Sequence, residues 1–323
     1  MKNNPFSLLF WCLLLLIGAC QAEPKEEKEK PLPIDPKDVV IDVQVGGVPT
    51  ADGLLLSFKR VGKGAETMIV PASVYLSDDL KGIASAYTVV FYDARNRGRS
   101  TTARKAQSLE GGIQKDVADL ERMRTFLKAE QFSTIGFGYY GLVVAEYAKQ
   151  YPNRIKKLIQ LSPFAPAPNT YDAFSDAIST EVAAAMMDLA QAKDSLSQQA
   201  YCEQWWGNQR KLYVVEQENA VRTLSTICQY PNEQPAARIA HWEQYLEPSV
   251  QNLAFAEADF ENLEAEVLIL HGDKDRVAPL EGAKAWEKLF PNAQLEVLEG
   301  AGHAAWMDKQ GLVMGAIQQF LQE

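Results

Sequence analysis

The sequence predicts an α/β fold, with a mostly parallel, doubly wound sheet and a block of helices inserted into it. Two observations carry this prediction. Short buried runs rich in Val, Ile and Leu alternate with segments of helical periodicity between residues 68 and 161, and this alternation is typical of parallel sheets. The alternation then stops at Ser162, only helical patterns follow as far as about Ala258, and strand-like runs resume at Val267.

The individual elements follow from the same periodicities. Two strand-like runs at 39–43 and 54–58, with turns expected at Gly46-Gly47 and Asp52-Gly53, predict an antiparallel opening of the sheet. Further strands are expected at 68–70, 87–92, 133–137, 155–161, 267–270 and 295–298. Helices are expected at 113–129, 139–150, 280–290 and 304–322.

The N-terminal segment has the features of an exported protein. Lys2 precedes an apolar run at 6–17, and small residues follow it up to Cys20. A basic start, about 12 apolar residues and small residues before a cleavage point predict a secretory signal peptide, too short to span a bilayer. Ile17-Gly18-Ala19-Cys20 resembles the bacterial lipobox, in which the cysteine is lipidated and becomes the mature N-terminus. The alternative is an ordinary signal peptide with an incidental cysteine.

A charged tether is expected to follow the signal peptide. Glu and Lys dominate residues 23–30, which contain no aliphatic or aromatic side chain, and three prolines follow. Gln21 after Cys20 favours, by resemblance, the outer membrane over the inner one. We expect a lipid-anchored protein of the bacterial envelope, facing the periplasm or the cell surface. The expected organisation is signal peptide 1–19, tether 20–37, first part of the core 38–162, helical lid 163–258 and second part of the core 259–323.

Composition narrows the classes of partner. The chain has 42 acidic and 32 basic residues, a net charge of −10 and no basic cluster, so we expect no nucleic-acid partner. An apolar content of 47% supports a sizeable core. The three histidines (His241, His271 and His303) show no ligand spacing, and we expect neither a metal nor another cofactor.

The cysteines predict one disulfide. Cys12 leaves with the signal peptide and Cys20 takes the lipid, so Cys202 and Cys228 remain as a pair in an oxidising compartment. A bond between them would stabilise the lid by roughly 3 kcal/mol in the chain-entropy model. The alternative is two buried free thiols.

Five segments, in a fixed order along the chain, indicate a family. They are Phe91-Tyr92-Asp93-x-Arg95-x-x-Gly98-x-Ser100, Tyr147-Ala148-x-x-Tyr151-Pro152-x-Arg154-Ile155, Cys228-x-x-Pro231-Asn232-Glu233, Gly272-Asp273-Lys274-Asp275-Arg276-Val277-Ala278-Pro279 and Gly300-Ala301-Gly302-His303. Together they resemble the α/β-hydrolase superfamily and, within it, the proline iminopeptidase-like group. The resemblance covers nearly the whole mature domain. It implies the α/β-hydrolase fold, in which nucleophile, acid and histidine follow one another in that order.

The resemblance assigns the acid and the base. Asp275, rather than Asp273, matches the acid, because it lies three residues after Gly272 and just before Val277. His303 matches the base. Asp275 would orient the imidazole and stabilise its protonated form, and His303 would take a proton from a hydroxyl. The alternatives are a loop carboxylate that caps the next helix and a buried structural histidine.

The nucleophile position is occupied by glycine. The family motif G-x-S-x-G stands on a sharp strand-to-helix turn, and here the turn reads Gly136-Phe137-Gly138-Tyr139-Tyr140-Gly141. Gly138 has no side chain and cannot attack a carbonyl, and a shift by one residue brings only Phe or Tyr into place. The turn is expected to need φ > 0, which glycine adopts freely.

The oxyanion hole is expected to be altered as well. One donor should be the backbone N–H of Tyr139, and the other should come from the loop after the third strand. That loop reads Val70-Pro71-Ala72-Ser73, and Pro71 has no N–H to donate. Ala72 or Ser73 would therefore have to supply the second donor.

These observations leave three hypotheses. The first is a pseudo-hydrolase that binds a small-molecule or peptide ligand in a pocket under the lid. The second is an active aminopeptidase or esterase that uses the Asp275–His303 pair by a non-standard route, and the third is a cofactor-free lyase. Glu203, Trp205 and Trp206 could line the pocket, since relatives hold a substrate amine with lid carboxylates. The alternative for the tryptophans is packing in the core.

Overall fold

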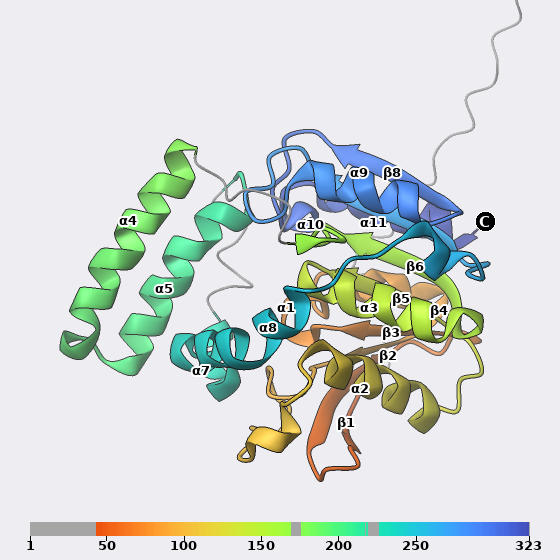
Figure 1. Cartoon of the computed structure of the whole chain (residues 1–323), viewed down its shortest axis with the longest axis horizontal. Helices are drawn as coiled ribbons and strands as arrows, with labels where there is room; N and C mark the ends of the chain where they lie inside the picture. The colour runs from red at the N-terminus through yellow and green to blue at the C-terminus, as the bar shows by residue number, and fades with distance from the viewer. Residues whose placement is uncertain (1–42, 169–175, 217, 219–225, 323) are drawn as a thin grey trace, which may run out of the picture. The chain divides into compact units, whose positions relative to one another are not determined.

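The computed structural model describes residues 43–168, 176–216, 218 and 226–322, which belong to one compact unit (Figure 1). The predicted signal peptide, Cys20 and the tether lie outside the described residues. No helix in the described ranges combines the length and the apolar content that a bilayer crossing requires.

Eight strands of the described chain form one sheet. They are β1 (Val43–Pro49), β2 (Leu55–Val61), β3 (Glu66–Pro71), β4 (Tyr87–Tyr92), β5 (Phe132–Phe137), β6 (Ile155–Leu161), β7 (Glu266–Gly272) and β8 (Ala293–Leu298). Their order is β1-β2-β4-β3-β5-β6-β7-β8. The β1–β2 and β2–β4 pairs are antiparallel, and the other pairs are parallel. The predicted α/β-hydrolase fold, with a mostly parallel sheet, is confirmed.

The first hairpin differs from the prediction. Gly46-Gly47 was expected to form a turn, but both residues lie inside β1. Gly46 pairs with Phe58 of β2, and a Cβ atom at Gly46 would lie 2.7 Å from Cζ of the Phe58 ring. The glycine thus makes room for a large aromatic side chain on the neighbouring strand. The chain turns only at residues 50–54, close to the predicted Asp52-Gly53 turn.

Helices cover the sheet. Those of the core are α1 (Ser73–Leu76), α2 (Ile113–Phe126), α3 (Tyr139–Gln150), α9 (Leu280–Leu289), α10 (Ala305–Asp308) and α11 (Gln310–Gln322). Helices α2 and α3 contact each other and the strands β3, β5 and β6, while α11 contacts β7. The single helix expected at 304–322 is two helices, because Lys309 leaves the helical conformation between α10 and α11.

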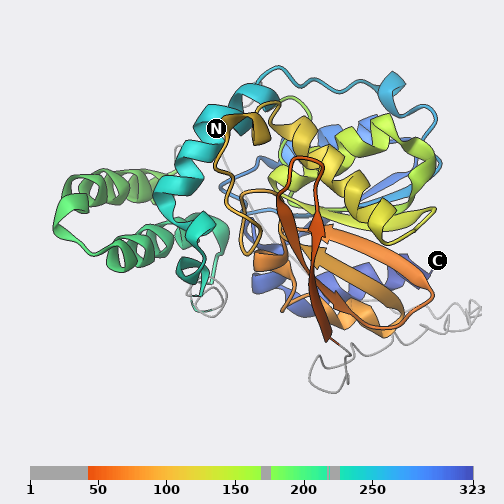
Figure 2. The same cartoon turned by 90° about the horizontal axis from the view of Figure 1, so that it is seen from below.

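Only helices and turns are found among the described residues between β6 and β7. The main ones are α4 (Ala177–Ala192), α5 (Gln198–Tyr213), α7 (Pro235–His241) and α8 (Glu247–Val250). The side chains of Asp176 and Ser197 accept backbone N–H bonds at the starts of α4 and α5, as N-caps do. Both views show α4 and α5 as a hairpin to one side of the sheet, with α7 and α8 between the hairpin and the strands (Figures 1 and 2).

The strand order decides where a site can form. Strands β5, β6, β7 and β8 are consecutive and parallel, so their carboxyl ends lie along one edge of the sheet. The loops that follow β5, β7 and β8 carry Gly138, Asp275 and His303. Ligand sites of open α/β sheets lie at this edge.

Candidate functional site

The turn between β5 and α3 has the backbone geometry of a nucleophile elbow. Gly138 has φ 54° and ψ −118°, a conformation that glycine adopts freely and that strains other residues. Its N–H donates to the carbonyl of Leu161 at 3.1 Å, and its carbonyl accepts from Gly141 at 3.0 Å and from Phe164 at 3.1 Å. The end of β6 and the residues after it therefore hold the turn in place.

Glycines on either side let strand and helix approach closely. A Cβ atom at Gly136 would lie 2.5 Å from the carbonyl oxygen of Tyr140, and one at Gly141 would lie 2.7 Å from Cβ of Pro163. Either substitution would push α3 away from its neighbours. This contact with Pro163 gives a packing reason for a glycine at 141.

Asp275 and His303 lie together at the carboxyl edge of the sheet. Oδ2 of Asp275 is 2.8 Å from Nδ1 of His303. Oδ1 of Asp275 accepts the N–H groups of Val277 at 2.7 Å and Ala278 at 2.8 Å. Both side chains are almost fully buried. Two backbone donors thus fix the carboxylate, and the carboxylate fixes the imidazole ring.

Other carboxylates shape the histidine loop rather than contact His303. Asp273 accepts the N–H of Gly300 at 2.7 Å, and Asp308 accepts the N–H of Gly302 at 2.9 Å. The structure therefore gives Asp273 a loop-holding position, and it is Asp275 that reaches the imidazole.

A second histidine near the acid was not assigned a role from the sequence. Nε2 of His271 lies 3.5 Å from Oδ2 of Asp275 and 3.2 Å from the carbonyl of Ala278. The side chain is fully buried, and burial lowers the pKa of His271. His271 is the sixth residue of β7 and lies four positions before Asp275, so the contact between the two is local.

The imidazole of His303 faces the position that a side chain at residue 138 would occupy. A Cβ atom built on Gly138 would lie 3.1 Å from Nε2 of His303 and 3.7 Å from Cε1 of Phe164. The rings of Phe137 and Tyr213 lie 4.8 and 5.2 Å from the imidazole, centroid to centroid. Aromatic packing and Asp275 together orient Nε2 toward position 138, which carries no reactive atom.

The predicted oxyanion donors are only partly placed at the cavity. Tyr139 is the first residue of α3, so its N–H has no partner within the helix, and Tyr139 lines the cavity described below. Ala72 and Ser73 are buried and do not line it. Ala72 has φ 69°, and Asp93 holds this turn by accepting the N–H of Val74 at 2.9 Å.

A cavity of about 410 Å³ opens over Gly138 and His303. Its volume lies in the range of small-molecule sites. The part of the wall that the described residues form is mainly aromatic and includes two arginines and one glutamate. The lining residues are Tyr75, Arg97, Phe137, Gly138, Tyr139, Tyr140, Phe164, Trp205, Gln209, Tyr213, Arg238, Ile239, Trp242, Glu243, Leu246 and His303.

The three lid residues expected at the pocket have different positions. Trp205 lines the cavity. Trp206 does not, because it is buried against Tyr75, with ring centroids 6.3 Å apart. Glu203 is exposed on α5 and accepts a hydrogen bond from Gln199 at 2.7 Å, so the expectation that it lines the pocket is wrong. Residues 203 and 205 are two positions apart on a helix and do not share a face.

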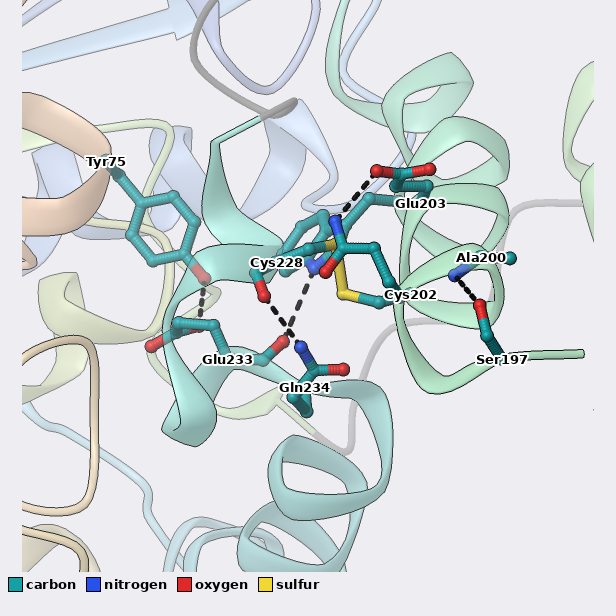
Figure 3. The surroundings of a disulfide bond; sticks show 10 residues. Tyr75, Ser197, Ala200, Cys202, Glu203, Cys228, Glu233 and Gln234 are labelled. Carbon is teal, nitrogen blue, oxygen red and sulfur yellow. Dashed lines mark hydrogen bonds between the residues drawn. A yellow bond between two sulfur atoms is a disulfide. The ribbon is translucent and has the colours of Figure 1, made fainter.

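The buried carboxylate of the lid is Glu233, which the sequence did not single out as a site residue. Its side chain is fully buried and accepts the N–H of Gly98 at 2.8 Å, the hydroxyl of Tyr75 at 3.0 Å and a guanidinium N–H of Arg238 at 2.5 Å. Figure 3 shows Tyr75 pointing toward this carboxylate. Glu233 thereby connects the lid to the loop after β4. Its place in the Cys228-x-x-Pro231-Asn232-Glu233 segment was the available signal.

A buried acid lies behind the elbow. The hydroxyl of Tyr139 donates to Oδ2 of Asp116 at 2.8 Å. Burial, with the charge of Asp119 beside it, raises the pKa of Asp116 to about 6. Asp119 is held by Arg95, which donates to both its oxygens at 2.8 and 2.6 Å.

The predicted disulfide is present. Cys202 of α5 is bonded to Cys228, with 5.9 Å between the Cα atoms, within the usual range (Figure 3). The bond joins α5 to the turn that precedes Asn232 and Glu233. In the described ranges, no group of three or more His, Cys, Asp or Glu side chains is arranged to hold a metal ion.

Comparison with known proteins places the chain in a family. Residues 74–310 match the alpha/beta hydrolase fold family. The AB hydrolase superfamily protein YclE of Bacillus subtilis is 31% identical over 116 residues, which are 35% of this chain and 40% of that protein. The chain thus spans less than half of that relative's length. A proline iminopeptidase of Xylella fastidiosa is 22% identical over 68% of this chain and 76% of its own length.

Solved structures share the architecture. A serine hydrolase of Cycloclasticus zankles covers 87% of this chain and 98% of its own, with a TM-score of 0.67 and 16% identity. At that identity the likeness concerns the fold alone. The family match, in contrast, extends over more than half of the sequence. The chain therefore belongs to the alpha/beta hydrolase fold family.

Proposed function

We propose that this protein is a pseudo-hydrolase, which binds a small ligand under the lid without cleaving it. One observation carries the proposal. Gly138 occupies the elbow with the backbone angles of a nucleophile, and Nε2 of His303 faces the place where the side chain is missing. The acid, the base and the cavity are retained, while the attacking atom is absent.

The described lining residues offer no well-placed replacement nucleophile, and the carboxylate among them, Glu243, is exposed. Among the described residues that line the cavity there is no Ser, Thr, Cys, Lys or Asp. The hydroxyls of Tyr75 and Tyr139 are hydrogen-bonded to Glu233 and Asp116. Burial raises the pKa of Tyr75, Tyr139, Tyr140 and Tyr213, the tyrosines found in the described part of the lining. Phenolate attack is therefore disfavoured at neutral pH.

A second candidate is a hydrolase that activates water directly. The observation in its favour is the intact pair, with 2.8 Å between Asp275 and His303. The vacated Cβ position lies 3.1 Å from Nε2 of His303, a hydrogen-bonding distance for a water oxygen. Without a covalent intermediate, one difficult step is no longer divided into two easier ones, and turnover would be slow.

We extend the proposal in two ways. The chain is a member of the proline iminopeptidase-like group, and it is anchored to a membrane by a lipid. The first rests on the shared segments and on the 22% identity to one such enzyme. The second rests on the lipobox-like sequence that ends at Cys20. Expression in a Gram-negative host with radioactive palmitate should label the native chain and move it to the outer-membrane fraction. Cys20→Ser should abolish both, and labelling of that variant would contradict the anchor.

The pseudo-hydrolase proposal is tested by turnover. Native protein and His303→Ala are assayed with p-nitrophenyl acetate, p-nitrophenyl butyrate and a panel of aminoacyl p-nitroanilides. We expect the two proteins to show the same background rate. Turnover above the uncatalysed background in the native protein, lost in His303→Ala, would instead establish the water-activating hydrolase, even at a rate below that of typical enzymes.

A further inference from the structure

Arg97 projects into the cavity from the loop after β4 and lacks an anionic partner. Its Nη1 donates to the carbonyl of Asn96 at 3.3 Å and contacts Nδ1 of His241. Neither group carries a negative charge. Among the residues that the structure describes, no Asp or Glu oxygen lies within ion-pair distance of this guanidinium, although the side chain is half-buried.

His241 cannot neutralise Arg97. The ring is buried, and burial together with the charges of Arg97 and Arg238 lowers the pKa of His241 to about 2. The imidazole is neutral at physiological pH, and its Nδ1 serves as a hydrogen-bond acceptor. It orients the guanidinium without compensating the charge.

Two neighbouring arginines of the described chain, Arg95 and Arg238, are paired. Arg95 bonds both oxygens of Asp119, and Arg238 bonds Glu233. Asp116 interacts electrostatically with Arg97, but its Oδ2 accepts the hydroxyl of Tyr139. A half-buried guanidinium that contacts no carboxylate directly is only partly compensated in a protein interior. An anionic ligand would complete the compensation at Arg97.

The rest of the lining agrees with an anion rather than an amine. Glu203 lies outside the cavity, and Glu233 is already bonded to Arg238. Among the described residues that line the cavity, the carboxylate is that of Glu243, which is exposed. The N-terminus of α3 opens at Tyr139, whose N–H has no partner within the helix, and the helix dipole there favours negative charge.

We propose that the cavity takes a small carboxylate with an apolar body, and that Arg97 binds its carboxylate group. The aromatic walls at Phe164, Trp205 and Trp242 would cover the apolar part. Arg97 would then be a specificity-determining residue, since a guanidinium binds a carboxylate with two parallel hydrogen bonds. The inference rests on the proposed ligand-binding function and names the ligand class for the same cavity.

The preference for a carboxylate is tested by calorimetric titration of the purified full chain with three ligands that share the same apolar group and differ in their polar end. The probes are phenylacetate, phenylacetamide and phenethylamine, and 4-phenylbutyrate with its amide and amine forms a longer set. We expect each carboxylate to bind at least about tenfold more tightly than its amide, and the amines to bind most weakly. Phenyl phosphate is added to learn whether Arg97 accepts other oxyanions, and its binding with loss in Arg97→Gln would also support the assignment.

Substitutions show whether the guanidinium of Arg97 is the group that binds the carboxylate. Arg97→Gln should lose about tenfold or more in carboxylate affinity while keeping its amide affinity, and Arg97→Lys should lie between it and the native protein. Arg104→Gln removes the same charge from an exposed position outside the cavity and should bind like the native protein. Unchanged amide binding in Arg97→Gln also shows that the variant is folded.

Three results would overturn the inference. These are equal affinity for carboxylate and amide, native-like carboxylate affinity in Arg97→Gln, and no binding of any probe acid. Hydrolysis by the native protein would contradict the proposed function instead, because it is measured with separate substrates and leaves the charge preference at Arg97 untouched.

Discussion

Nε2 of His303 lies 3.1 Å from the point where a Cβ atom on Gly138 would stand. The imidazole is oriented by Asp275 from the other side, at 2.8 Å. The Asp275–His303 pair is therefore directed at a position that carries no side chain, which is the geometry on which the proposed pseudo-hydrolase rests. The predictions below follow from this geometry and from the contacts that hold the lid.

A side chain at position 138 should destabilise the protein. Gly138 has φ 54° and ψ −118°, which costs a residue with a Cβ about 1–3 kcal/mol. The new Cβ would also push His303 by a few tenths of an ångström. Urea unfolding should show Gly138→Ala and Gly138→Ser to be less stable than the native chain by a similar amount. Native stability in both variants would mean that the elbow is unstrained.

The lid should depend on its disulfide. Cys202 and Cys228 are 26 residues apart, and closing a loop of this length stabilises a fold by roughly 3 kcal/mol in the chain-entropy model. The paired variant Cys202→Ser/Cys228→Ser should unfold at lower urea and become sensitive to limited proteolysis within the lid. An unchanged midpoint and digestion pattern would show that packing alone holds α5 in place.

The Glu233–Arg238 pair should show strong coupling. Glu233 is fully buried and accepts three hydrogen bonds, whereas Arg238 keeps partial exposure. Removing one member of a buried pair leaves the other unpaired and costs about 3–5 kcal/mol. Glu233→Gln and Arg238→Gln should each lower the free energy of unfolding strongly. The double variant should lose less than the sum of the two single losses. Simple additivity in urea unfolding would indicate that the two groups act independently.

Ionisation of Asp116 should lower the free energy of unfolding as the pH rises. Its pKa is about 6 in the folded protein and 3.8 in the reference state, so the folded state binds more protons between these values. Stability from this group is present below pH 4 and is lost as the pH rises through 6. The difference in free energy of unfolding between Asp116→Asn and the native chain should shift by about 3 kcal/mol in favour of the variant between pH 4 and pH 8. Parallel pH profiles of the two proteins in urea unfolding would contradict this.

Local patterns were sufficient for the fold and for part of the site. The alternation of buried runs and helical segments predicted the parallel sheet, and the resemblance of the segment after Gly272 to the family's acid loop distinguished Asp275 from Asp273. Positive φ at the elbow also followed from the chemistry of a sharp strand-to-helix turn. Each of these properties depends on residues that are neighbours in the sequence.

The remaining features depend on contacts between distant segments. Gly46 was read as a turn residue because the ring of Phe58, on the paired strand, is invisible to local periodicity. Glu233 meets Gly98 across 135 residues and Arg97 meets His241 across 144. The lid was expected to contribute Glu203, but the helix turns that side chain to solvent. Which lid charge faces the cavity is a property of tertiary packing.

The most direct test of the account is covalent labelling with a fluorophosphonate probe. The native protein, Gly138→Ser and the double variant Gly138→Ser/His303→Ala are treated in parallel, and the modified residue is mapped by mass spectrometry. We predict no labelling of the native protein, labelling at position 138 in the single variant, and its loss in the double variant. Stoichiometric labelling of the native protein at any cavity residue would contradict the claim that this hydrolase fold has lost its nucleophile.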